Sequence, residues 1–261
     1  MKNNEFFKII QGAESFHYDG NSTGILICHG FLGTPQSMEY LGQAFANKGY
    51  TVRAPRLRGH GTHYFDLEKA TFTDWIHELE ENYLQLKDKC SQVFVLGQSM
   101  GGLLSLLIAS KFKDVSGVIT INVAFEVPDY EQYRNKLLPN YIEEGPPDIN
   151  NKEVKEITYP YVPLKSINEL LKLIDFTKDQ ITSIKSPVLL MHSKVDNVVP
   201  PISSKIIYER LKTTKKELVQ LNNSCHVASM DFDQDKIVID TDRFITSIVN
   251  FQYELNHIST P

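Results

Sequence analysis

The sequence predicts an α/β fold in which a mostly parallel sheet carries helices on both faces. Short apolar runs, such as residues 24–28, 93–96 and 187–191, are typical of strands that are buried on both sides. Segments with apolar residues at helical spacing separate these runs. Strands that alternate with helices pair in parallel through right-handed crossovers, so helices are expected to cover both faces of the sheet.

The strands are expected in a regular order along the chain. The N-terminal stretch predicts a short hairpin, whose strands 6–10 and 15–18 flank a turn at Gly12. The remaining predicted strands cover residues 24–28, 50–55, 93–96, 117–121, 187–191 and 217–221.

The helices are placed by residues that favour helix ends. Thr34 followed by Pro35 opens one helix, which Gly49 closes. Thr73 and Asp74 are expected to cap a second helix. Further helices are predicted over residues 103–108, 202–211 and 240–250.

The regular pattern stops between residues 125 and 183. This stretch is rich in prolines and charges, contains a short helical piece over residues 167–176, and shows no obvious strand. Its tyrosines and leucines favour an ordered structure over a disordered linker. We therefore expect one domain over residues 1–261, with residues 125–183 as a small helical cap inserted into it. This stretch is called the insert below.

Composition argues against several classes of function. The net charge of −5 provides no basic surface for nucleic acid or an anionic membrane. No apolar run approaches the length of a membrane span, and the N-terminal residues lack the apolar core of a signal peptide. The three cysteines are scattered and odd in number. A cytoplasmic protein without disulfides is expected.

The most informative motif is Gly97-Gln98-Ser99-Met100-Gly101. It follows a predicted buried strand and precedes an apolar helix, so Ser99 is expected at the tip of a sharp turn. A serine hydroxyl needs such exposure, because it attacks only when a base can reach it. Gly97 and Gly101 lack a Cβ, which lets the strand and the helix approach each other. We predict that Ser99 is a nucleophile rather than an ordinary helix cap.

A base and an acid are predicted from the ends of later strands, where functional groups of parallel sheets collect. His226 follows the strand that ends at residue 221 and is predicted to be the base. Asp196 follows the strand that ends near residue 191 and is predicted to orient that histidine. Asp175 and Asp179 are alternative acids, of which Asp179 is the serious rival.

The oxyanion of the reaction needs preorganised hydrogen-bond donors. The backbone amide of Met100, at a helix N-terminus, and that of Phe31, after the strand 24–28, are predicted to provide them.

Four other side chains that could be reactive, those of His29, His60, His63 and Cys225, are expected to have structural roles. His29 is expected to shape the turn before Phe31. His60 and His63 have the spacing of a metal pair, but no second ligand cluster accompanies them, so neither a metal nor a cofactor is predicted. Cys225 adjoins His226 and is expected to be a small packing residue rather than a nucleophile.

Together these features resemble the α/β-hydrolase superfamily and, more narrowly, its bacterial carboxylesterases and monoacylglycerol lipases. Stretches 30–38 and 55–64 are the most lipase-like. The resemblance implies an eight-stranded, mostly parallel sheet, a small cap over the serine, and hydrolysis of short to medium acyl esters without a cofactor. The residues that carry it are His29-Gly30-Phe31, the motif around Ser99, Asp196 before Val199-Pro200, and Ser224-Cys225-His226.

Two further residues enter through the resemblance alone. Residues 154–157 and Asn122 resemble the monoacylglycerol lipase pattern, which implies that Glu156 and Asn122 bind glycerol hydroxyls. The alternatives are a solvated charge at Glu156 and, at Asn122, an asparagine that bonds its own loop.

The predicted function is that of a serine esterase, which forms an acyl-enzyme on Ser99 that water then releases. The expected partner is a small acyl ester, with monoacylglycerols or similar medium-chain esters favoured. Contact with lipid aggregates through the insert would be transient, without stable membrane insertion. A broad carboxylesterase and a thioesterase are the alternatives within the enzyme class. A ligand-binding receptor that retains a slow triad is the alternative outside it.

Overall fold

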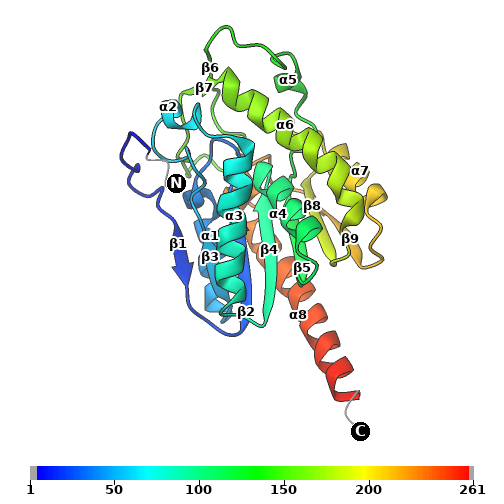
Figure 1. The fold of residues 1–261 in the computed structure, drawn as a ribbon. Coiled ribbons are helices and arrows are strands. Elements are labelled where there is room, and N and C mark those ends of the chain that lie inside the picture. The colour runs from blue at the N-terminus through cyan, green and yellow to red at the C-terminus, as the bar shows by residue number, and fades with distance from the viewer. Residues whose placement is uncertain (1–4, 259–261) are drawn as a thin grey trace.

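The computed structural model describes residues 5–258, with residues 252–258 described by their backbone alone. A seven-stranded sheet in the order β1-β3-β2-β4-β5-β8-β9 forms its centre (Figure 1). Every neighbouring pair is parallel except β1 and β3, which are antiparallel. The predicted mostly parallel sheet is therefore confirmed. Its strands are β1 (Phe16–Tyr18), β2 (Thr23–Cys28), β3 (Thr51–Ala54), β4 (Gln92–Gln98), β5 (Gly117–Ile121), β8 (Val188–Ser193) and β9 (Lys216–Leu221).

The expected count of eight strands is one too high, and the N-terminal hairpin explains the difference. Residues 6–10 form no strand. The backbone amides of Phe6 and Phe7 instead donate to the carboxylate of Asp66, at 2.9 and 3.1 Å. These bonds hold the segment against the helix that contains Asp66, so only the second half of the predicted hairpin joins the sheet.

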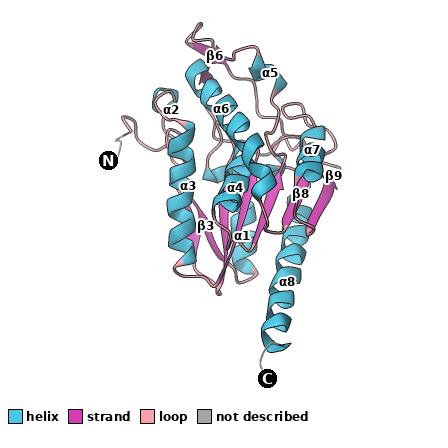
Figure 2. Cartoon of the chain, turned by 45° about the vertical axis from the view of Figure 1, so that its right-hand side comes forward, coloured by secondary structure: helices cyan, strands magenta, loops and turns pink. Residues whose placement is uncertain are grey.

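Helices cover both faces of the sheet, as predicted (Figure 2). Successive residues of β4 point to opposite faces: Val93 and Val95 pack in one apolar cluster, Phe94 and Leu96 in the other. Helices α3, α4 and α6 contribute to the first cluster, and α1 and α8 to the second. The α-helices are α1 (Glu39–Asn47), α2 (Tyr64–Leu67), α3 (Phe72–Lys87), α4 (Met100–Lys111), α5 (Pro128–Glu131), α6 (Leu164–Gln180), α7 (Ile202–Arg210) and α8 (Gln234–Ile258).

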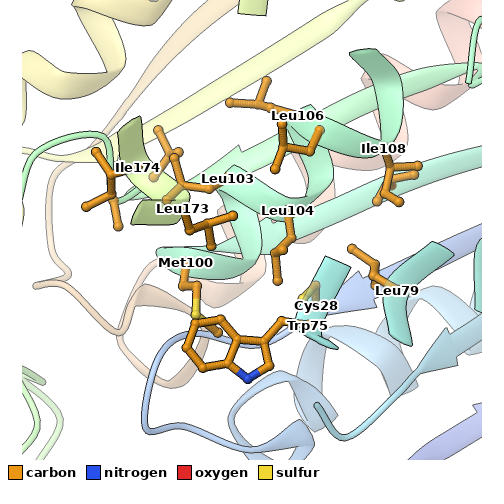
Figure 3. Packing of buried hydrophobic residues seen from close by; sticks show 14 of the residues in the cluster. Cys28, Trp75, Leu79, Met100, Leu103, Leu104, Leu106, Ile108, Leu173 and Ile174 are labelled. Carbon is orange, nitrogen blue, oxygen red and sulfur yellow. The ribbon is translucent and has the colours of Figure 1, made fainter. Parts of the chain in front are cut away.

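Helix α4 is apolar around its whole circumference because it is enclosed on all sides. One side faces the sheet. Figure 3 shows other side chains of α4, such as Met100 and Leu104, in one apolar cluster with Trp75 of α3 and Leu173 of α6. This enclosure fixes the N-terminus of α4, where the serine motif lies.

The start of α3 differs from the prediction by two residues. Thr71, rather than Thr73, caps the helix: its hydroxyl accepts from the amide of Asp74 at 3.3 Å. The Asp74 carboxylate accepts in return from the Thr71 amide at 2.8 Å. Thr71 and Thr73 both precede Asp74 closely, so the sequence is compatible with a helix that begins after either threonine.

The insert lies between β5 and β8, at the end of the sheet where the parallel strands terminate (Figure 1). Its main helix, α6, is longer than the predicted helical piece. The expectation that the insert has no strand is wrong, because β6 (Tyr141–Glu143) and β7 (Tyr161–Pro163) form an antiparallel pair. Each strand has three residues, too few for an alternating pattern to be recognised.

No helix within residues 5–258 is long and apolar enough to cross a membrane.

Candidate active site

Ser99 lies at the tip of the turn between β4 and α4, with φ 56° and ψ −117°. This strained backbone is what the predicted turn requires. A Cβ on Gly97 would lie 2.0 Å from the carbonyl oxygen of Gly101, and one on Gly101 would lie 2.3 Å from that of Cys28. Only glycine fits either position, because the strand and the helix approach each other closely there, as the motif predicts.

Ser99, His226 and Asp196 form a continuous chain of hydrogen bonds. His226 Nε2 lies 2.9 Å from Ser99 Oγ, and His226 Nδ1 lies 2.9 Å from Asp196 Oδ2. The three residues follow β4, β9 and β8 respectively, so the parallel sheet brings them to one edge. This arrangement can move a proton from the serine hydroxyl to the imidazole while a buried carboxylate stabilises the resulting positive charge.

Asp196 is held firmly in its loop. The side chain is 2% exposed, and its Oδ1 accepts from the amides of Val198 and Val199 at 2.9 and 2.7 Å. The rival acids lie elsewhere: Asp179 is exposed on α6, and Asp175 pairs with Arg134 at 2.7 Å. The carboxylate that reaches the histidine is therefore that of Asp196.

The two predicted oxyanion donors flank the serine. Met100 is the first residue of α4, so its amide has no acceptor within the helix. Phe31 follows Gly30, and a Cβ on Gly30 would lie 3.3 Å from that of Ser99. The loop containing Phe31 therefore passes directly beside the serine.

His29 braces this loop, as its structural interpretation requires. Its Nδ1 donates to the carbonyl of Gly30 at 2.9 Å, and its Nε2 accepts from the amide of Leu57 at 3.1 Å. Burial lowers the pKa of His29 to about 4, so the ring is neutral at pH 7 and can make both bonds.

A pocket opens beside Ser99 and His226, and the insert forms much of its wall. One part of the wall is apolar and includes Leu32, Val127 and Leu170. Another part is polar, with the carboxyl groups of Glu144 and Glu156 and the side chain of Thr158. The pocket thus offers an apolar surface and hydrogen-bonding groups to the same ligand.

The predicted residue Glu156 lies in this pocket rather than on a solvated helix. It is partly buried in an extended stretch of the insert. Burial raises the pKa of Glu156, the charge of His226 partly opposes this rise, and the charge of the neighbouring Glu144 adds to it, so that the pKa lies at about 7. Burial also raises the pKa of Glu144. Both acids therefore stay protonated to a higher pH than ordinary carboxyl groups do.

The other predicted substrate residue, Asn122, is buried behind the triad. Its Nδ2 lies 2.7 Å from the carbonyl oxygen of His226 and 2.9 Å from Ser193 Oγ, and its Oδ1 accepts from the amide of Ser193 at 2.7 Å. These bonds occupy the side chain, which does not line the pocket. The alternative, an asparagine that bonds its own loop, also differs from the structure, because Asn122 joins the end of β8 to the loop of His226.

His60, His63 and Cys225, the other side chains considered in the sequence, are engaged in packing. The His60 ring packs edge-on against Trp75, and the His63 ring stacks on that of Phe7. Among the side chains that the structure describes, those of residues 5–251, no group of three metal-ligating side chains comes together. Cys225 is a buried free thiol.

Asp148 is a residue at this site that the sequence did not reveal. It belongs to the insert and lines the pocket, and its carboxylate accepts from the backbone amides of Asn197 and His226. It follows Gly145-Pro146-Pro147 in an irregular stretch with no motif or periodicity, so no local signal distinguishes it from a surface aspartate.

The chain is similar to a known protein family and to known enzymes along most of its length. Residues 21–233 match the family described as serine aminopeptidase, S33. A thermostable monoacylglycerol lipase from Bacillus sp. (strain H-257) is 42% identical over 236 residues, which are 90% of this chain and 94% of that protein. A carboxylesterase from Bacillus subtilis (strain 168) is 26% identical over 239 residues, 89% of this chain and 96% of that one.

A solved structure gives the same picture. A chain from the work on the metagenome-derived lipolytic enzymes LipS and LipT superimposes with a TM-score of 0.89 and 35% identity. The match covers 92% of this chain and 100% of the other. The similarity therefore extends over the sheet, the helices and the insert together.

Proposed function

The chain belongs to the family of α/β-hydrolases described as serine aminopeptidase, S33, and we propose that within it the chain hydrolyses monoacylglycerols and related short- to medium-chain acyl esters. It is a serine carboxylic ester hydrolase. A lipase and a carboxylesterase resemble it over nearly their whole lengths, and lipolytic enzymes share its fold at 35% identity. These relatives favour esters over the peptides that the family description mentions.

In the proposed reaction, His226 removes the proton of Ser99 as the serine oxygen attacks the ester carbonyl. The amides of Phe31 and Met100 stabilise the oxyanion, and Asp196 stabilises the imidazolium. His226 then returns the proton to the departing alcohol, which leaves an acyl group on Ser99. Water, activated by the same histidine, attacks this acyl-enzyme and releases the fatty acid. No step requires a metal or a cofactor.

The observation that carries this proposal is the unbroken chain from Ser99 through His226 to Asp196, with both bonds at 2.9 Å, beside a pocket of mixed character. The apolar wall suits an acyl chain. A glycerol leaving group presents free hydroxyls, for which a carboxyl group such as that of Glu156 is a suitable partner. We propose this contact for Glu156, and a positioning role for Asn122.

We further propose that the insert acts as the cap of the site. Its exposed leucines, Leu137 at 62% and Leu138 at 76%, support transient contact with lipid aggregates. We also propose that the protein acts in the cytoplasm. Its cysteines Cys28, Cys90 and Cys225 are all free and buried, as is usual in a reducing compartment.

A matrix of substrates tests the proposal. We would measure kcat/KM for acyl chains from acetyl to palmitoyl, each on glycerol, ethanol and a thiol. Monoacylglycerols of medium length are expected to give the highest values. Equal values for glycerol and ethyl esters would indicate a broad carboxylesterase, and a preference for thiol esters would indicate a thioesterase. A ligand-binding receptor would turn over none of them at an enzymatic rate.

A further inference from the structure

Asp148 lies where three segments of the chain meet. Its Oδ2 accepts from the backbone amide of Asn197 at 3.0 Å and from that of His226 at 3.1 Å, and its Oδ1 accepts from the side-chain amide of Asn197 at 2.7 Å. Its backbone carbonyl also accepts from the amide of Val227 at 3.1 Å. One residue of the insert thus binds the neighbour of Asp196 and the backbone of His226.

All the side-chain partners of Asp148 are donors. An ionised carboxylate satisfies them because it only accepts hydrogen bonds. An asparagine has a single accepting oxygen. If that oxygen met the two backbone amides, its NH₂ would face the side chain of Asn197, whose own amide would have to turn round to accept from it. Only a carboxylate accepts the three bonds as they stand, and only a carboxylate brings a negative charge to this position.

The charge of Asp148 also acts on the site. Burial raises the pKa of this carboxyl, but hydrogen bonds from Asn197 and His226 and the charge of His226 outweigh that effect, so the pKa lies below its ordinary value. The group is ionised at neutral pH. Its negative charge faces the residue that becomes positive during attack.

We infer that Asp148 is a positioning residue, which fixes the loops of Asp196 and His226 relative to each other and thereby makes the insert part of the machinery for the chemical step. This inference rests on the roles proposed above for Ser99, His226 and Asp196. Asp148 contacts the backbone around the triad rather than the reacting atoms, so its effect reaches the reaction through His226 and Asp196.

The test compares Asp148→Asn with a matched control, Asp233→Asn. The carboxylate of Asp233 accepts from the backbone and side-chain amides of Asn223, at 2.7 and 3.0 Å, in the pattern that Asp148 makes with Asn197. Asn223 lies in the loop of His226, three residues before it, so this control removes a carboxylate from the same loop without breaking a bond to Asp196, Asn197 or His226. We expect Asp148→Asn to lower kcat by about 10- to 100-fold with KM changed less than about threefold, because small misplacements of reacting groups slow chemistry strongly. Asp233→Asn is expected to retain kcat even where it lowers the melting temperature as much.

A spectroscopic measurement separates positioning from stability. The proton between His226 Nδ1 and Asp196 should give a resolved low-field NMR resonance, which we expect to shift or broaden in Asp148→Asn and to stay in place in Asp233→Asn. Wild-type kcat and an unchanged resonance in Asp148→Asn would overturn the inference, as would equal losses of kcat in both variants. If Asp148→Asn does not fold, Asp148→Glu decides by the same criteria, since it keeps the charge but moves it by one methylene.

Ser99→Ala is measured alongside. Turnover retained by Ser99→Ala would refute the proposed function itself. Turnover lost in Ser99→Ala but unchanged in Asp148→Asn would refute only the inference about Asp148.

Discussion

The end of the sheet and the insert contribute to the site in different ways. Ser99, Asp196 and His226 follow regular strands, and the sheet sets their separation through its own hydrogen bonds. Glu156 and Asp148 belong to irregular backbone, which is held by individual contacts to neighbouring segments of the chain. One such contact joins the side-chain amide of Gln36 to the carbonyl of Lys155 at 2.9 Å.

The proposed roles divide the properties of the enzyme between these two regions. We propose that the sheet edge carries the groups that every ester needs for cleavage. We propose that the insert carries the groups that contact only part of the substrate, together with one carboxylate, that of Asp148, which positions the triad. Substitutions at the sheet edge should therefore affect all substrates equally, whereas most substitutions in the insert should change the ratio between substrates.

The largest effect is expected from Ser99→Ala. Removing the attacking oxygen should reduce kcat by about 10⁴-fold or more for glycerol, ethyl and thiol esters alike. The fold should persist, which circular dichroism and the melting temperature would check. Substantial remaining turnover with any of these esters would exclude Ser99 as the nucleophile.

Asp196→Asn should have the next largest effect. Without the carboxylate, the imidazole loses the partner that selects its tautomer, and a loss of up to about 10⁴-fold in kcat is expected. Asp179→Asn is the matched control, since that side chain is exposed on α6, and its kinetics should equal those of the wild type. The reverse outcome would assign the acid to Asp179.

Glu156→Ala probes the insert. Loss of a hydrogen bond between a carboxyl group and a glycerol hydroxyl should lower kcat/KM for monoacylglycerols by about tenfold. Ethyl esters of the same acids should be affected much less, because they lack those hydroxyls. Equal losses for both ester types would remove the proposed contact and would make the insert resemble the sheet edge in its effect.

The smallest effect is a pH dependence of selectivity. The pKa of Glu156 is raised to about 7, so the group is mostly protonated at pH 6 and mostly ionised at pH 8. The ionised form accepts hydrogen bonds from glycerol hydroxyls more strongly than the neutral form. The ratio of kcat/KM for glycerol over ethyl esters should therefore rise between pH 6 and 8, while effects common to both substrates cancel. In Glu156→Gln the ratio should be flat, and a rise retained there would assign the dependence to another group.

The same contrast explains what could be predicted from the sequence. The elbow of Ser99 was recognisable because two glycines must occupy positions where a Cβ would collide with backbone. Asp196 and His226 were recognisable because parallel strands bring their carboxyl ends together. The family and the mostly parallel sheet are confirmed, and the catalytic roles of these residues stay predictions that the geometry supports.

The features of the fold and the site that the sequence did not predict depend on contacts between distant segments of the chain. The first strand of the predicted N-terminal hairpin does not form. Two backbone amides of that segment instead donate to the carboxylate of Asp66, some sixty residues away. Asn122 was assigned to the substrate by resemblance, but its partners, Ser193 and the carbonyl of His226, are distant in sequence. The partners of Asp148, Asn197 and His226, are also distant in sequence. Such roles follow from tertiary hydrogen bonds, which leave no periodic pattern in the chain.

Activation of Ser99 by His226 can be measured with a serine-directed phosphonate, which reacts only with a nucleophilic serine. Wild-type protein should lose activity as one phosphonate is bound per chain, with the label on Ser99, and His226→Ala should react far more slowly. A label on another residue, or a Ser99 that stays unmodified while esters are still cleaved, would show that Ser99 is not the activated nucleophile.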